Sequence, residues 1–147
     1  MAGKLHLRVI TPEDVKLDEQ CDMVITRCTT GDMGILPRRE AVSAILDYGV
    51  LRIINNDQAE RHMAIFGGIV QVKDDEVTLL TNGAQWPEDI DRALAEAEHE
   101  TAERRLQEAG DDVEMQKQQV SLRRTLVQIE VSSYPLLSVG GAGKDNG

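Results

Sequence analysis

The first 86 residues alternate between short apolar runs and polar turn sequences. The runs are rich in valine and isoleucine, which favour the extended backbone of a half-buried strand. Asn55-Asn56-Asp57 and Lys73-Asp74-Asp75 stand where hairpin turns are expected, because Asn and Asp adopt left-handed conformations. Gly67-Gly68 is interpreted as a bend between two strands. The pattern predicts an antiparallel sandwich or barrel, with strands at residues 5–10, 23–28, 50–54, 62–66, 69–72 and 77–81.

The periodicity becomes helical after Trp86-Pro87. Pro87 suits a first helical turn, and Gly110 is placed to end a helix of roughly 20 residues. Alanines make up most of its apolar positions, and at roughly 25 cal/mol per Å² such a stripe predicts weak docking. These positions are Ile90, Ala93, Leu94, Ala97, Ala102, Leu106 and Ala109.

A second helix is predicted from Asp112 or Val113 to about Ser133, with Pro135 ending it. Its apolar residues form two stripes about 180° apart, so the helix needs two neighbours. The alternative is a strand over residues 127–131, where apolar and polar residues alternate. One stripe contains Met115, Leu122, Leu126 and Ile129, and the other contains Val113, Val120, Val127 and Val131.

The domain organisation follows from these two patterns. We expect an all-β N-terminal sandwich or barrel over residues 1–86, followed by a C-terminal antiparallel α-helical hairpin over residues 87–137. Residues 138–147 contain four glycines and almost no apolar bulk, which predicts a disordered tail.

Composition limits the partners. The 147 residues include 16 basic and 26 acidic side chains, a formal net charge of −10. This charge argues against nucleic acid or anionic lipid as the main ligand. No apolar run approaches the roughly 18 residues of a membrane span, and the start of the chain resembles no secretion signal. We therefore expect a cytosolic protein, with Cys21 and Cys28 as buried, reduced thiols.

The sequence contains no recognisable catalytic or metal-binding pattern. The three histidines are scattered without metal-ligand spacing, and no nucleophile motif is present. Acidic clusters lie at predicted turns, where solvated carboxylates are the default, and Gly67-Gly68 lacks the spacing and lysine of a phosphate loop. No catalytic residue, metal or cofactor is predicted. A thiol-dependent enzyme would require an activated Cys21 or Cys28.

The segment Gly31-Asp32-Met33-Gly34-Ile35-Leu36-Pro37 predicts a tight protruding loop. Glycine permits positive φ angles, and proline fixes the exit from the loop. Asp32 is then the projecting charge, which suits docking on another protein. From its chemistry alone, an ordinary turn residue is the simpler interpretation of Asp32.

This segment resembles the corresponding motif of the epsilon subunit of F-type ATP synthases. Three later segments match further landmarks of that family in order and spacing: residues 66–72, residues 77–80, and Glu88-Asp89-Ile90-Asp91 at the start of an alanine-rich stretch. The resemblance covers roughly residues 4–134. One departure is Arg38-Arg39-Glu40-Ala41, where the family usually has Gly-His-Ala-Pro.

The resemblance implies a non-catalytic rotor subunit that couples c-ring rotation to the catalytic head. It would contact the gamma subunit, the c-ring and the catalytic alpha and beta subunits, and would meet the membrane only through the complex, at the cytoplasmic face of a bacterial cell membrane. The hairpin would be regulatory, and inhibition of ATP hydrolysis is the role that the resemblance suggests for it. The resemblance implies a c-ring contact through Gly31, Asp32, Met33 and Arg38, and a catalytic-subunit contact through Arg123 and Arg124.

A nucleotide site at Ile90, Asp91 and Arg92 is a further expectation from the resemblance. Nucleotide-binding members carry an arginine where this chain has Leu94. Arg92 lies two residues earlier, about 200° around the helix, and cannot replace it. The alternative is an ordinary helix start with a Glu88–Arg92 ion pair. A stand-alone ATP-sensing module is the alternative function.

Overall fold

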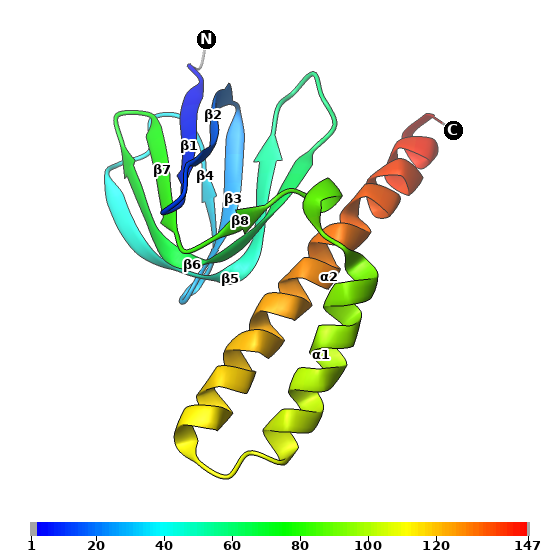
Figure 1. Cartoon of the computed structure of the whole chain (residues 1–147). Helices are drawn as coiled ribbons and strands as arrows, with labels where there is room; N and C mark the ends of the chain where they lie inside the picture. The colour runs from blue at the N-terminus through cyan, green and yellow to red at the C-terminus, as the bar shows by residue number, and fades with distance from the viewer. Residues whose placement is uncertain (1–2, 147) are drawn as a thin grey trace. The chain divides into compact units, whose positions relative to one another are not determined.

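The computed structural model describes residues 3–146, with side chains from Gly3 to Tyr134. It forms two compact units, Met1–Gln85 and Trp86–Gly147. The described part of the first unit contains eight strands (Figure 1): β1 (Leu5–Ile10), β2 (Val15–Cys21), β3 (Met23–Cys28), β4 (Gly31–Ile35), β5 (Val42–Ile54), β6 (Arg61–Lys73), β7 (Glu76–Thr81) and β8 (Ala84–Gln85).

The strands form one sheet in the order β2-β1-β7-β6-β5-β3-β4, with β8 paired to β6. The single residue Asp22 joins β2, at one edge, to β3, next to the other edge. The sheet must therefore curl over itself. Arg61 on β6 also forms an ion pair with Glu19 on β2, although these strands are not neighbours in the sheet. The predicted β-sandwich is confirmed.

An aliphatic core lies between the two layers. Alternate residues of β1 are fully buried, and the adjacent β7 alternates in the same way. This period of two is expected when only one face of each strand meets the core. The largest fully buried side chains include Leu5, Leu7, Ile35, Leu51, Ile53, Met63, Ile65 and Leu79.

The bend predicted at Gly67-Gly68 lies within a single strand. The 13-residue β6 covers the two strands expected at 62–66 and 69–72, and it pairs with the equally long β5. Both glycines have positive φ angles, of 77° and 126°. A Cβ atom on Gly68 would lie 2.1 Å from the carbonyl oxygen of Leu80. The pairing of β5 with β6 therefore continues on both sides of the bend, and the bend does not end the strand.

Three further strands, β2, β4 and the two-residue β8, lie at positions where no strand was predicted. β2 and β4 form the two ends of the sheet order, and most of their side chains are exposed or half-buried. Edge strands tolerate polar and charged residues, so their sequences lack the apolar alternation that identifies inner strands. The segment expected to be a protruding loop is thus β4 followed by a turn at Pro37 and Arg38.

The second unit contains a short 3₁₀ turn, η1 (Pro87–Asp89), and two helices, α1 (Arg92–Gln107) and α2 (Asp112–Asn146). Pro87 begins η1, so the prediction that it begins the long helix is wrong. The extended backbone of Asp91 separates the two elements. Its carboxylate accepts a hydrogen bond of 3.1 Å from the amide of Leu94 and caps α1. Asp111 caps α2 through the amide of Glu114.

The observed α2 is longer than expected. The helical backbone continues to Asn146, so the predicted end near Ser133 and the strand at 127–131 do not describe it. The disorder expected for residues 138–147 stays a prediction. A proline removes one backbone donor, but each later residue adds a helical hydrogen bond of its own. Gly147 and the side chains beyond residue 134 lie outside the described part of the chain.

The helical pair confirms the predicted hairpin, but its packing positions differ from the predicted apolar stripes. Ala95 and Ala102 are buried on α1, whereas Leu94 is 55% exposed. On α2, Gln118 and Thr125 are buried beside α1, Val127 and Val131 are also buried, and the remaining stripe residues are half-buried or exposed. The angular position of a residue around its helix decides whether it faces the other helix. In this hairpin, small or polar side chains lie at the positions that face the other helix.

We predict that Gly68→Ala lowers the free energy of unfolding by about 3 kcal/mol or more, because a Cβ atom would strike the β7 backbone. Urea denaturation followed by circular dichroism measures this change. Gly31→Ala is the matched control, since Gly31 has nearly the same φ of 125° but open space around it. It should cost only about 1–2 kcal/mol. Equal losses in the two variants would contradict the steric explanation.

Candidate partner-binding surfaces

A row of exposed apolar side chains crosses the outer face of the sheet. Ile45 on β5 is paired with Ile69 on β6, which is paired with Leu80 on β7. Leu80 is paired with Ile10 on β1, which is paired with Val15 on β2. We call these five residues the apolar row. Four of them are substantially exposed: Ile45 (61%), Val15 (55%), Ile69 (40%) and Leu80 (39%).

Side chains directly opposite one another in a sheet have Cβ atoms about 5 Å apart, so the apolar row is one continuous surface. Single exposed apolar residues are ordinary, but contiguous groups mark sites of association. This surface was not predicted from the sequence. Its signal is a set of apolar doublets, Ile45-Leu46, Ile69-Val70 and Leu79-Leu80, because in a strand one member of each doublet must face outward.

Gly31, Asp32 and Met33 are consecutive residues of β4. Asp32 is paired with Arg27 on β3, and its carboxylate lies 3.6 Å from the Arg27 Nε atom. Both side chains are well exposed, at 64% and 41%. The acidic group at this surface is therefore half of an ion pair.

Arg38 lies three residues beyond the other end of β4, so the structure does not bring it together with Asp32. Its backbone adopts a φ of 67°, and its amide donates a 2.6 Å hydrogen bond to the Asp75 carboxylate. The side chain borders a hollow of about 530 Å³ that Arg39, Lys73 and Asp74 also line. Basic and acidic groups alternate around this hollow.

The residues expected to form a nucleotide site serve the start of α1. Asp91 is the N-cap of α1, Ile90 is the C-cap of η1, and Arg92 forms a 2.9 Å ion pair with Glu96. The expected pair between Glu88 and Arg92 is therefore replaced by one a turn further along. The Asp91 carboxylate accepts a hydrogen bond from the backbone amide of Leu94, so it is engaged within α1.

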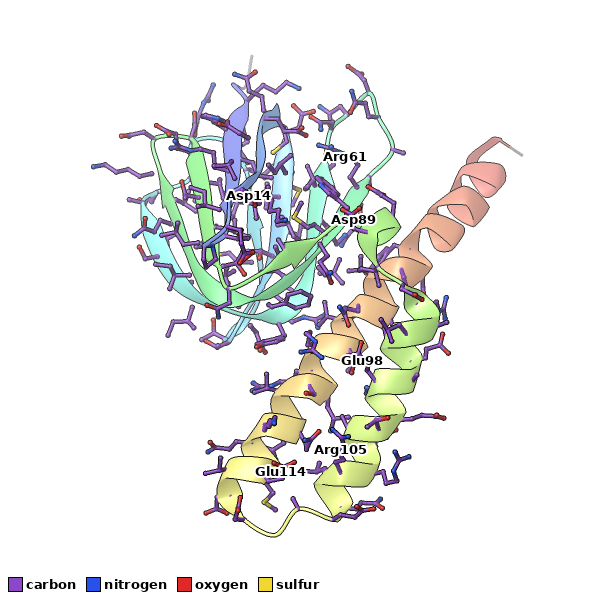
Figure 2. The ribbon with its side chains drawn as sticks, in the orientation of Figure 1. Asp14, Arg61, Asp89, Glu98, Arg105 and Glu114 are labelled. Carbon is purple, nitrogen blue, oxygen red and sulfur yellow. The ribbon has the colours of Figure 1, made fainter. Side chains whose placement is uncertain are left out.

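A shallow groove of about 340 Å³ runs along the seam between α1 and α2. Leu94, Ala97 and Ala102 give it an apolar side, and Arg105 and Arg124 supply positive charge. Glu98 and Arg105 both lie on the side of α1 that faces α2 (Figure 2). Arg124 lies 3.5 Å from the Glu98 carboxylate, which partly neutralises it. The neighbouring Arg123 is exposed.

The thiols and histidines show no arrangement for catalysis. Burial raises the pKa of Cys21 to about 11, and burial with the charge of Asp32 raises the pKa of Cys28. A raised pKa keeps a thiol protonated and unreactive near neutral pH. His62 is 6% exposed and bonded to Glu60, which also holds Arg52. Among residues 3–134, no group of three metal-ligating side chains converges.

The helices of the described chain include none that is long and apolar enough to cross a membrane.

Comparison with known proteins connects both units to one family. Residues 4–87 match the model "ATP synthase, Delta/Epsilon chain, beta-sandwich domain", and residues 88–133 match its "long alpha-helix domain". The chain is 35% identical to the ATP synthase epsilon chain of Halalkalibacterium halodurans over 129 residues, covering 87% of this chain and 96% of the relative. It is 36% identical to that of Syntrophobacter fumaroxidans over 132 residues, covering 90% and 98%.

The fold also matches a chain in the mitochondrial ATP synthase structure of Euglena gracilis, solved as "OSCP/F1/c-ring". The TM-score is 0.79 with 22% identity, over 90% of this chain and 82% of the other. Two family models together cover most of the sequence, and relatives above 30% identity align over nearly their full length. This chain therefore belongs to the ATP synthase delta/epsilon chain family, whose epsilon chains are non-catalytic subunits of that enzyme.

Proposed function

We propose that this protein is the rotor-stalk subunit through which c-ring rotation is coupled to the catalytic head, and that the apolar row is its contact with the gamma subunit. The row is the observation that carries the proposal. It aligns five apolar side chains in register across five strands, four of them substantially exposed. Burying such a surface against a partner gives roughly 25 cal/mol per Å² before the costs of association.

We assign the contact with the c-ring to Gly31, Asp32 and Met33. The Arg27–Asp32 pair offers the polar loops of the ring both a donor and an acceptor at one edge of the sheet. Arg38 lies beyond the opposite end of β4 and would meet another part of the ring or the gamma subunit. Because the chain would reach the membrane only through these subunits, we place it at the cytoplasmic face of a bacterial cell membrane.

We assign to the hairpin a contact with the catalytic alpha and beta subunits. Arg123 is exposed, and Arg124 is held only by an exposed ion pair with Glu98. Exposed pairs contribute little stability, so Arg124 can exchange Glu98 for an acidic segment of a partner, and Arg123 adds a second positive charge at the same exposed position of α2. This contact would let the hairpin restrain ATP hydrolysis.

A nucleotide-sensing function has weaker support. The groove beside α1 carries Arg105 and Arg124, but Asp91 is occupied as a helix cap and Leu94 takes the place of an arginine. An apolar side chain provides no hydrogen bond to a phosphate, and Glu98 beside Arg124 repels one.

The first prediction tests the apolar row. Ile69→Glu should weaken binding of the isolated gamma subunit by at least about tenfold, because a carboxylate must lose its water on docking. Surface plasmon resonance measures the affinity. The matched control is Gln71→Glu, which adds the same charge two residues along β6 on the same face. Equal losses for both variants, or none for Ile69→Glu, would contradict the assignment.

The same binding series separates the ring contact from the gamma contact. Asp32→Lys places two cations beside each other on β3 and β4, and should weaken association with the c-ring and ion-driven ATP synthesis while leaving gamma binding unchanged. The variant should remain folded because Asp32 is exposed. Normal ring association and synthesis would show that the contact lies elsewhere.

Another prediction concerns the affinity of the isolated protein for ATP. Calorimetry on the isolated protein should give a dissociation constant in the millimolar range or weaker, which corresponds to no more than about 4 kcal/mol of binding free energy. The variant to compare with the unchanged protein is Leu94→Arg, since it restores the missing cation beside the groove. Micromolar binding by the unchanged protein would overturn this prediction.

A final prediction concerns the regulation of ATP hydrolysis by the hairpin. A chain ending at Trp86 should still fold and assemble, because residues 1–85 form a compact unit of their own. The enzyme carrying it should synthesise ATP and should hydrolyse ATP faster than the enzyme with the full chain. The amount of bound subunit must be measured in both preparations. Unchanged hydrolysis at equal occupancy would remove the regulatory role.

A further inference from the structure

The seam of the helical hairpin is unusual in what it buries. The only buried residues of α1 are two alanines, Ala95 and Ala102. Facing them on α2 are two buried polar residues, Gln118 and Thr125. Large apolar side chains such as Leu94 and Leu126 are instead 55% and 56% exposed. Separating the helices would therefore uncover little apolar surface along α1.

One hydrogen bond crosses this seam from a half-buried side chain of α1 to a fully buried side chain of α2. The Nδ1 atom of His99 lies 2.8 Å from the Oγ1 atom of Thr125, which is 0% exposed. The Thr125 hydroxyl also lies 2.8 Å from the carbonyl oxygen of Ser121, one turn earlier on α2. A hydroxyl has one hydrogen, and a carbonyl can only accept. With its hydrogen on the Ser121 carbonyl, the Thr125 oxygen accepts from a His99 Nδ1–H, and with His99 in the Nε2–H tautomer the hydroxyl donates to Nδ1 instead.

The two side chains can therefore bond across the seam in either neutral tautomer of His99. The Nε2 atom faces Glu103 at 4.0 Å, on the same helix. In the charged imidazolium Nδ1 also carries a hydrogen and donates to Thr125, so each state of the ring has a hydrogen bond across the seam.

We propose that the His99–Thr125 hydrogen bond is the latch that holds α1 and α2 in their closed register. A second link across the seam, between Glu98 and Arg124, is 3.5 Å long, and its two side chains are 45% and 39% exposed, so water screens it. The alanines contribute contact but no directional bond. Removing one partner of the latch leaves the other polar group facing a closed seam, which penalises the closed form specifically.

The latch itself depends only on the hairpin, and its consequence for ATP hydrolysis rests on the regulatory role proposed above. Opening leaves Thr125 bonded to Ser121 and lets water replace it as the partner of His99. The closed and open forms then differ by few strong interactions, so a partner with a modest preference for one form shifts the balance between them.

The test uses native-state hydrogen exchange of the full-length protein. Thr125→Val keeps the shape of the side chain and removes the acceptor, and it should speed exchange of α1 amides roughly 5- to 10-fold, the equivalent of about 1 kcal/mol. Thr125→Ser keeps the hydroxyl and should stay within about twofold of the unchanged protein. Thr101→Val is the matched control, a half-buried threonine on α1 that borders the same groove. Amides of the sandwich should not change in any variant.

A double-mutant cycle with His99→Leu separates a latch from a packing effect. If the two residues form one bond, the double variant should exchange no faster than the faster single variant. Multiplicative effects of the two substitutions, or equal effects of Thr125→Val and Thr101→Val, would overturn the proposal.

Hydrolysis assays of the assembled enzyme decide the second question separately. If the chain ending at Trp86 raises hydrolysis, Thr125→Val should change hydrolysis and Thr125→Ser should not. A different outcome is coupling of His99 and Thr125 in hydrogen exchange while hydrolysis responds neither to the truncation nor to Thr125→Val. That combination would support the latch and would contradict the regulatory function.

Discussion

The pairing of β5 with β6 is the constraint on which the sandwich depends. These two long strands cross from one layer to the other, and every other strand is placed relative to them. The crossing requires a sharp bend, which Gly67 and Gly68 supply with φ angles that other residues rarely adopt. The Thr81 hydroxyl donates to the carbonyl of Gly67, so β7 holds the bend in place. One flexible dipeptide thus turns a flat ladder into a two-layered core.

The same pairing creates the surface that we assign to a partner. Because β5, β6 and β7 stay in register beyond the bend, the outward members of their apolar doublets align across the sheet as the apolar row. Their inward neighbours fill the core. Folding and association therefore draw on adjacent residues of the same strands, and a register shift of one residue would exchange the two sets.

The hairpin follows a different physical design. The sandwich excludes water with large aliphatic side chains, whereas the seam between α1 and α2 buries alanines and polar groups. A core of the first kind unfolds as a unit, because opening any part of it exposes apolar surface. A seam of the second kind is held by hydrogen bonds and exposed ion pairs that water can replace. This contrast suits a rigid platform that carries a separable element.

The sequence by itself determined the fold class, the hairpin turns and the family, because alternation, turn residues and ordered motifs are local properties. It located the inner strands but not β2 and β4, whose polar edge positions carry no alternation. It also placed Asp32 in a loop, although strand pairing uses it, and it offered both a ligand site and an ordinary helix start at Asp91, which caps α1. Only the tertiary structure decided which apolar residues face outward and that His99 meets Thr125, since both depend on register between segments distant in sequence.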